Sequence, residues 1–133
     1  MAMRAADETS RATRVMLVDD HPLIHEGLMK LFDEIDDVDL VGFAPDGEAA
    51  PDVCRRCAPD VVLMDLRLPG IDGIEATRRL MTDQPSVGVL LLTAFPSSRV
   101  IDEVTTAGAV GCLSKDDSAE TMLNAIRAAA AAA

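Results

Sequence analysis

The chain has 133 residues, of which 49% are hydrophobic, so its length and composition suit one globular domain with a single core. Apolar runs such as 87–92 are far shorter than the roughly 18 residues of a membrane-spanning helix, which predicts no membrane segment. The formal net charge of −11 predicts that this stretch does not bind nucleic acid by itself, because affinity for phosphate backbones comes mostly from Lys and Arg.

The first fourteen residues are polar, carry both signs of charge and contain no apolar stretch like that of a secretory signal. We therefore expect 1–14 to form a disordered lead-in and 15–133 to form the folded domain. Because the chain shows neither a signal nor a membrane segment, its expected location is the cytoplasm.

Five short, mostly apolar runs are spaced along the rest of the chain and are expected to be strands. They cover 15–18, 39–44, 61–64, 87–92 and 109–113. Strands that are buried on both faces of a parallel sheet have this nearly continuous apolar character.

An amphipathic segment follows each of these runs and is expected to be a helix. In the first, apolar residues recur at helical spacing from Ile24 to Ile35, and Pro22 stands where a first helical turn tolerates proline. The others are expected around 50–58, from near Ile71 until Pro85, from Ser97 or Ser98, and from Asp117. Asp117 is followed three residues later by Glu120, as in a capping box.

Three cysteines, Cys54, Cys57 and Cys112, are too few and too irregularly spaced for a disulfide framework. The Cys-x-x-Cys pair could indicate a redox site or half of a zinc site. However, the pair falls at the same helical spacing as its apolar neighbours, and no second pair or cluster of histidines accompanies it. We therefore favour core packing for this pair.

Alternation of strands and helices is typical of an α/β domain, in which helices cover both faces of a parallel sheet. Functional groups in such domains collect at the carboxyl ends of the strands. The groups that follow the predicted strands here are Asp19, Asp20, Asp65, Thr93 with Ala94, and Lys115.

Three carboxylates in one small space repel each other unless a cation neutralises them, and Mg²⁺ is a cation that carboxylates commonly bind. An aspartate beside such a metal can attack phosphorus and form an aspartyl phosphate. A lysine ammonium and a hydroxyl group are suited to stabilise the transferred phosphoryl group.

The same residues belong to longer motifs. These are Asp19-Asp20-His21-Pro22 with Gly27-Leu28, Asp65-Leu66-Arg67-Leu68-Pro69-Gly70-Ile71-Asp72-Gly73, Thr93-Ala94, and Ala107-Gly108 with Lys115-Asp116. Their joint occurrence between about Val15 and Arg127 resembles the receiver domain of two-component response regulators, in particular the NarL/FixJ or LuxR-type subfamily. The resemblance implies a flavodoxin-like, doubly wound (βα)5 fold with a five-stranded parallel sheet in the order 2-1-3-4-5.

The resemblance also implies roles for the acidic residues. Asp65 is expected to accept the phosphoryl group, and Mg²⁺ (or Mn²⁺) is expected to be bound by Asp20, Asp65, the backbone carbonyl of Arg67, and Asp19, either directly or through water. His21 is expected beside the site without binding the metal, and His25 on the solvated surface.

The phosphoryl group is expected to bind Thr93 and Lys115, with Ala94 small enough to let it approach. Arg67 and Phe95 occupy positions that control access of water, so they are expected to slow hydrolysis of the aspartyl phosphate. Receivers commonly have an aromatic residue three positions before the lysine, where this chain has Cys112. We therefore expect a weaker coupling between Thr93 and the fourth helix.

The function implied is Mg²⁺-dependent transfer of a phosphoryl group from a phosphohistidine of a sensor histidine kinase, which switches a partner or dimer surface. The protein is expected to be a signalling domain and not an enzyme, although it promotes its own phosphorylation and dephosphorylation. A homodimer through this domain is one possible assembly. No output domain is expected in this chain, and DNA would be reached only through an absent C-terminal helix-turn-helix domain.

Other interpretations are weaker. The aspartates could be helix caps or turn residues, Lys115 a solvated lysine, and Thr93 the end of a buried strand. A haloacid-dehalogenase phosphatase would need a second aspartate where Arg67 stands, and a dinucleotide-binding oxidoreductase would need a glycine-rich turn after the first strand. A pseudo-receiver that binds partners without phosphorylation is the remaining alternative, to which Cys112 lends support.

Overall fold

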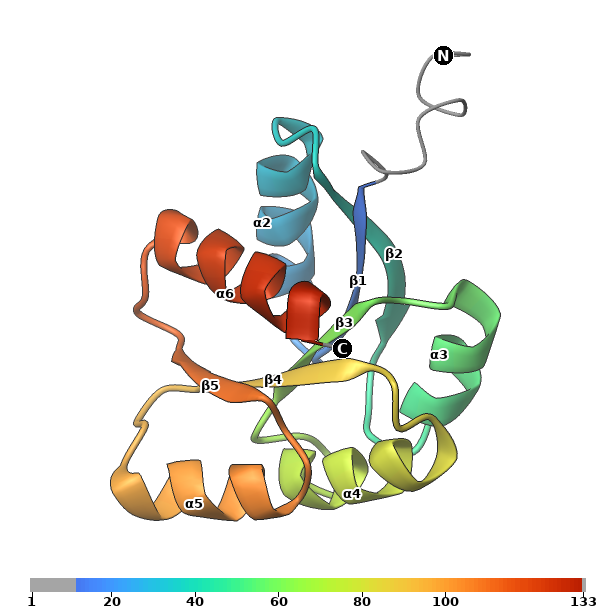
Figure 1. Ribbon diagram of the computed structural model, residues 1–133, viewed down its shortest axis with the longest axis vertical. Coiled ribbons are helices and arrows are strands. Elements are labelled where there is room, and N and C mark those ends of the chain that lie inside the picture. The colour runs from blue at the N-terminus through green and yellow to red at the C-terminus, as the bar shows by residue number, and fades with distance from the viewer. Residues whose placement is uncertain (1–11, 133) are drawn as a thin grey trace.

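The computed structural model describes residues 12–132, which form one five-stranded parallel sheet in the order β2-β1-β3-β4-β5 (Figure 1). The strands are β1 (Thr13–Val18), β2 (Val38–Ala44), β3 (Val61–Asp65), β4 (Gly88–Thr93) and β5 (Gly111–Ser114). The helices are α2 (Pro22–Asp33), α3 (Ala50–Cys57), α4 (Gly73–Asp83), α5 (Ser98–Thr106) and α6 (Ala119–Ala132). The predicted fold class and strand order are confirmed.

Helices cover both faces of the sheet: Figure 1 shows α2 and α6 on one face and α3, α4 and α5 on the other. Alternate residues of each strand serve the two faces, because successive side chains of a strand point in opposite directions. In β1, Val15 and Leu17 pack with α2 and α6, whereas Met16 and Val18 pack with α3, α4 and α5. Every residue of β3 and β4 is buried, which explains their continuous apolar sequence.

The N-terminal boundary of the domain lies earlier than predicted. Thr13 and Arg14 belong to β1, where they pair with Val38 and Asp39, and the Thr13 amide donates to the Asp37 carbonyl at 2.9 Å. The expected lead-in 1–14 is therefore wrong for its last two residues. Residues 1–11 of that prediction lie outside the described part of the chain.

The start of α6 also differs from the prediction. The helix begins at Ala119, and the Ser118 hydroxyl accepts the Thr121 amide at 3.1 Å, so Ser118 caps the helix. The Asp117 carboxylate instead accepts the Ser114 amide at 2.9 Å and stabilises the turn after β5. The expected capping box of Asp117 and Glu120 is therefore wrong.

The cysteine pair of α3 packs in the core, as predicted. Cys54 is fully buried among apolar residues, and burial raises the pKa of its thiol to about 11. Cys57 is half-buried at the end of the helix and packs against the same cluster. Because metal binding and thiol exchange require the thiolate, the raised pKa disfavours both at Cys54.

His25 is not a solvated surface residue. Its ring stacks on the ring of Phe43 in β2, with the ring centroids 4.3 Å apart, and the side chain is half-buried.

Between residues 12 and 132, no helix has the length and apolar character to span a membrane.

Candidate functional site

Most of the predicted site residues lie at the carboxyl edge of the sheet, where hydrogen bonds hold the backbone at the ends of the strands. The Asp19 amide donates to the Ala44 carbonyl at 3.1 Å, which fixes the backbone just after β1. Asp65 is the last residue of β3 and Thr93 the last of β4. The Lys115 amide donates to the Thr93 carbonyl at 2.8 Å and brings the loop after β5 to the same edge.

Asp65 lies at the centre of this group and is fully buried. The Lys115 ammonium is 3.0 Å from its Oδ1, and the Arg67 amide donates to the same oxygen at 3.2 Å. Lys115 itself is partly exposed, with 29% of its side chain accessible. A buried carboxylate thus faces a cation that is reached from solvent.

Asp19, Asp20, His21 and Asp65 form an acidic cluster in which one ligand atom from each residue lies within 4.8 Å of the others. The Asp19 carboxylate is fully buried, whereas Asp20 is exposed. Asp19 Oδ1 accepts the His21 amide at 2.7 Å and lies 2.8 Å from His21 Nδ1, so the start of α2 holds the cluster together.

His21 lies beside the site, as predicted, and faces the carboxylates. Its Nδ1 is 3.2 Å from an oxygen of Asp20 and 3.8 Å from Asp65 Oδ2. The hydrogen bond with Asp19 and the charges of Asp19 and Asp20 raise the pKa of His21, while burial and Lys115 act in the opposite direction. A protonated imidazole would offset part of the negative charge of the cluster.

Two carboxylate oxygens of the cluster are buried without a hydrogen-bond partner within the described part of the chain: Asp19 Oδ2 and Asp65 Oδ2. A buried charged oxygen is unfavourable unless it is paired or binds a metal ion. Oxygen ligands from two or three carboxylates are those that Mg²⁺ and Mn²⁺ prefer. The donor set therefore fits a divalent cation.

A cavity of about 130 Å³ opens next to Asp65 and is lined by Leu66, Arg67, Thr93, Ala94, Phe95, Val100 and Lys115. One water molecule needs only about 10 to 15 Å³ by this measure, so a larger group fits. The Thr93 hydroxyl accepts the Phe95 amide at 3.2 Å, which leaves its own O–H free to donate. The sequence did not predict Leu66 or Val100 here, because both have the apolar character of core residues.

Arg67 and Phe95 both line this cavity and are exposed; 79% of Phe95 is accessible to solvent. Cys112, in contrast, is not among the residues that line it. The cysteine is half-buried and packs against the core cluster under α3, α4 and α5. It also borders a separate cavity of about 350 Å³ between β5 and the alanine-rich face of α6. Burial, and then the charge of Asp117, raise the pKa of its thiol.

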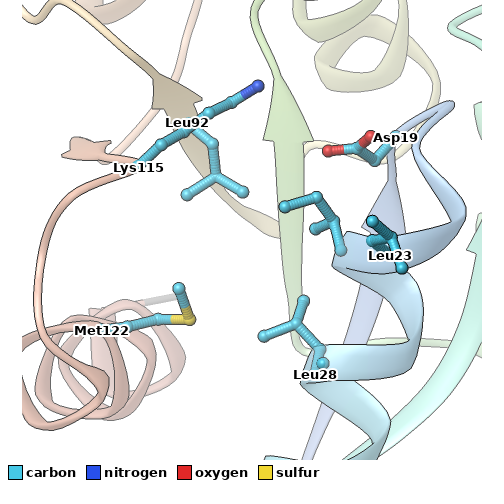
Figure 2. A pocket seen from close by; sticks show the side chains of 8 residues that line it. Asp19, Leu23, Leu28, Leu92, Lys115 and Met122 are labelled. Atoms are coloured by element: carbon cyan, nitrogen blue, oxygen red, sulfur yellow. The ribbon is translucent and has the colours of Figure 1, made fainter.

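A third pocket, apolar and of about 200 Å³, adjoins the site between α2 and α6. Figure 2 shows Asp19 and Lys115 at one end of this pocket and the side chains of Leu28, Leu92 and Met122 beyond them. The charged site therefore adjoins an apolar pocket.

The chain is similar in sequence to known proteins. Residues 15–127 match the response regulator receiver domain family. The response regulator GacA of Pseudomonas aeruginosa is 39% identical over 114 residues, which cover 86% of this chain and 53% of GacA. The response regulator UvrY of Escherichia coli strain K12 is 41% identical over 113 residues, which cover 85% of this chain and 52% of UvrY. The chain thus spans about half the length of the curated relatives that it matches.

A solved structure gives the same result for the fold. The crystal structure of a two-component response regulator of the LuxR family from Aurantimonas sp. SI85-9A1 superposes with a TM-score of 0.85 at 36% sequence identity. The match covers 91% of this chain and 86% of that chain.

Proposed function

The chain belongs to the response regulator receiver domain family, and on this basis we propose that Asp65 accepts a phosphoryl group from a phosphohistidine of a sensor histidine kinase. One observation carries the assignment of Asp65: its carboxylate is buried beside the equally buried Asp19 and lies 3.0 Å from the Lys115 ammonium. Its second oxygen has no hydrogen-bond partner among residues 12–132. The helix-capping carboxylate of Asp72, in contrast, accepts the Glu75 amide and is exposed to solvent.

In the proposed reaction, a carboxylate oxygen of Asp65 bonds to phosphorus while the phosphorus–nitrogen bond of the phosphohistidine breaks. The bonding electron pair stays on the imidazole nitrogen of the donor. Lys115 offsets the charge on one phosphoryl oxygen, and the Thr93 hydroxyl donates to another. Mg²⁺ or Mn²⁺ bound by Asp19, Asp20, Asp65 and the Arg67 carbonyl would supply positive charge to the phosphoryl oxygens and relieve the repulsion among the carboxylates.

Phosphorylation would then act as a switch. The added charge favours a conformation in which Thr93 and Lys115 both contact the phosphoryl group, so it shifts the balance between two conformers. The surface formed by α5, β5 and α6, or the one formed by α2 and α6, would transmit the change to a partner or a second receiver.

The partners and location are inferred from the family. We propose that the protein is cytoplasmic and that it controls transcription through a C-terminal helix-turn-helix domain in the full-length protein. The likeness to a LuxR-family regulator supports this output. The promotion of phosphorylation and dephosphorylation by the domain itself is part of the same proposal.

Incubation with acetyl phosphate and Mg²⁺, followed by intact mass measurement, tests the proposed acceptor. The wild-type protein is expected to gain the mass of one phosphoryl group, and Asp65→Asn is expected to gain none. Asp72→Asn, a helix-capping aspartate of α4 in the following loop, serves as a matched control and should still be phosphorylated. Labelling of Asp65→Asn, or no labelling of the wild type, would contradict the proposal and favour a pseudo-receiver.

A further inference from the structure

The loop that follows the phosphoacceptor, residues 66–72, connects β3 to α4 and carries Arg67. Its first residue is fixed at both polar groups of the backbone: the Leu66 amide donates to the Leu92 carbonyl at 2.9 Å, and the Leu66 carbonyl accepts the Gly73 amide at 2.8 Å. Gly73 allows this contact, since a Cβ there would lie 2.3 Å from the Asp65 carbonyl oxygen. The base of the loop is therefore held directly against the acceptor.

The far end of the loop is held by a residue from a different loop. The Ile71 amide donates to Glu48 Oε2 at 3.2 Å, a contact between residues 23 positions apart. Gly70 adopts a φ of +77°, and a Cβ at Gly70 would lie 2.5 Å from the same Glu48 oxygen. The Glu48 carboxylate thus fits against the backbone of Gly70 and Ile71, where a side chain at position 70 would displace it.

The loop that presents Glu48, between β2 and α3, is itself braced. The Asp46 carboxylate accepts the Ala49 amide at 2.8 Å and closes a turn around Gly47. A Cβ at Gly47 would lie 2.8 Å from Ile71 Cγ1, so the two loops are in close contact there as well. Glu48 is therefore presented to the tip of the 66–72 loop from a turn that is closed by a hydrogen bond.

We propose that Glu48 is a positioning residue for phosphorylation, although it contacts neither the acceptor nor the acidic cluster. By holding Gly70 and Ile71, it fixes the path of the 66–72 loop and hence the backbone of Arg67 beside Asp65. This inference rests on the proposed function of Asp65. It assigns to an exposed glutamate on a neighbouring loop a role that its position in the sequence does not indicate.

Three variants separate positioning from charge and from stability. Glu48→Ala removes the acceptor, whereas Glu48→Gln keeps an oxygen that can accept the Ile71 amide and removes only the charge. Glu34→Ala is the matched control, because it also removes one exposed carboxylate but lies at the opposite end of α2 from the site. Amide hydrogen exchange over 66–72, the rate of phosphorylation by acetyl phosphate across Mg²⁺ concentrations, and the thermal midpoint are measured for each.

Glu48→Ala is expected to speed amide exchange at Ile71 by about fivefold, the factor for one lost hydrogen bond, and to slow phosphorylation severalfold. Its thermal midpoint should fall by only a few degrees relative to Glu34→Ala, as expected for one lost hydrogen bond, and Glu48→Gln should restore most of the exchange protection and of the phosphorylation rate. Wild-type exchange and phosphorylation rates in Glu48→Ala, or equal defects in Glu48→Ala and Glu48→Gln, would overturn the inference. If the wild-type protein gains no phosphoryl group, the proposed function fails, whereas the exchange rates still report on the contact itself.

Discussion

At the scale of single residues, the acidic cluster represents a conflict between function and stability. Asp19 and Asp65 are both fully buried, and each has one oxygen without a hydrogen-bond partner in the described structure. Such groups lower the stability of the folded state unless a cation satisfies them. The cluster is therefore expected to destabilise the protein in the absence of divalent cations.

Replacement of Asp19 by Asn tests this expectation. Without divalent cations, Asp19→Asn should raise the free energy of unfolding by about 1 to 3 kcal/mol, because it removes a buried charge and keeps an oxygen that accepts the His21 amide. With Mg²⁺ present, the wild type should gain stability by mass action and the variant much less. Urea unfolding with EDTA and with Mg²⁺ measures both effects. A less stable Asp19→Asn in EDTA would contradict this account.

Arg67 and Phe95 are expected to control the lifetime of the aspartyl phosphate, because both line the cavity beside Asp65 and are exposed to solvent. Arg67→Ala and Phe95→Ala should each shorten the half-life of the phosphorylated protein severalfold by admitting water. The decay of the phosphorylated mass after removal of acetyl phosphate measures this half-life.

Two variants provide controls for this comparison: Arg99→Ala removes an exposed arginine of α5, and Leu23→Ala removes an apolar side chain that, like Phe95, is 79% exposed. Neither residue lines the cavity beside Asp65. Half-lives of Arg67→Ala and Phe95→Ala that equal those of the controls and the wild type would show that neither residue shields the phosphoryl group.

At the scale of elements, the coupling between β4, β5 and α5 should be weak. Cys112 pairs with Leu91 in the sheet but does not line the cavity beside Asp65. A cysteine also fills much less space than an aromatic ring. When Thr93 moves toward the phosphoryl group, the side chain of Cys112 is too small to fill the space that Thr93 leaves. The movement of α5 on activation is therefore expected to be small.

Amide chemical shifts with and without beryllofluoride test this coupling. We expect large changes near Asp65, Thr93 and Lys115 but small changes over 97–113, and larger changes over 97–113 in Cys112→Tyr. If the wild type shows changes throughout 97–113 that are as large as those of Cys112→Tyr, Cys112 does not limit the movement of α5.

Most elements could be predicted because their evidence is local. Strands such as β3 and β4 are continuous apolar runs, and the site residues follow directly where these strands end. The start of α6 could not be predicted, since Asp117 and Ser118 can both cap a helix and the choice depends on the turn that Asp117 makes with Ser114. The inclusion of Thr13 in β1 depends likewise on pairing with a distant strand.

At the scale of the whole molecule, contacts between distant segments are the part that sequence reasoning missed. The stacking of His25 on Phe43 and the contact of Glu48 with Ile71 join different elements, and no local pattern indicates either pair. The residues of the site could nevertheless be predicted, because the parallel topology alone brings the ends of the strands together. Its acidic cluster could be predicted, whereas the residues that support it could not.

The ion pair between Asp37 and Arg127 connects the start of β2 to α6 across 90 residues of sequence. Two hydrogen bonds join the side chains, from Nε at 2.8 Å and from Nη2 at 2.9 Å. The hydrogen bond from Arg127 lowers the pKa of Asp37 below its ordinary value of 3.8. A carboxylate with a lowered pKa contributes stability above its unfolded pKa and loses it as the pH falls through the folded pKa.

Thermal midpoints of the wild type and Arg127→Ala, measured from pH 7 down to acid conditions, test this contribution. The wild type should be modestly more stable at neutral pH, and the difference should shrink as the pH falls below 3.8. Both side chains are about half exposed, so the difference should also decrease with added salt. A difference that stays constant from neutral to acid pH would show that Arg127 acts through packing alone.

The central claim is that carboxylates from separate strands converge on one divalent cation so that Asp65 can carry a phosphoryl group. A crystal structure with Mg²⁺ and beryllofluoride tests it most directly, since beryllofluoride bonds to an acceptor carboxylate in place of the phosphoryl group. The account predicts beryllium bonded to Asp65, Mg²⁺ bound by Asp20 and Asp65, and Lys115 and Thr93 in contact with fluorine atoms. Beryllofluoride on another carboxylate, or Mg²⁺ away from Asp20 and Asp65, would contradict it.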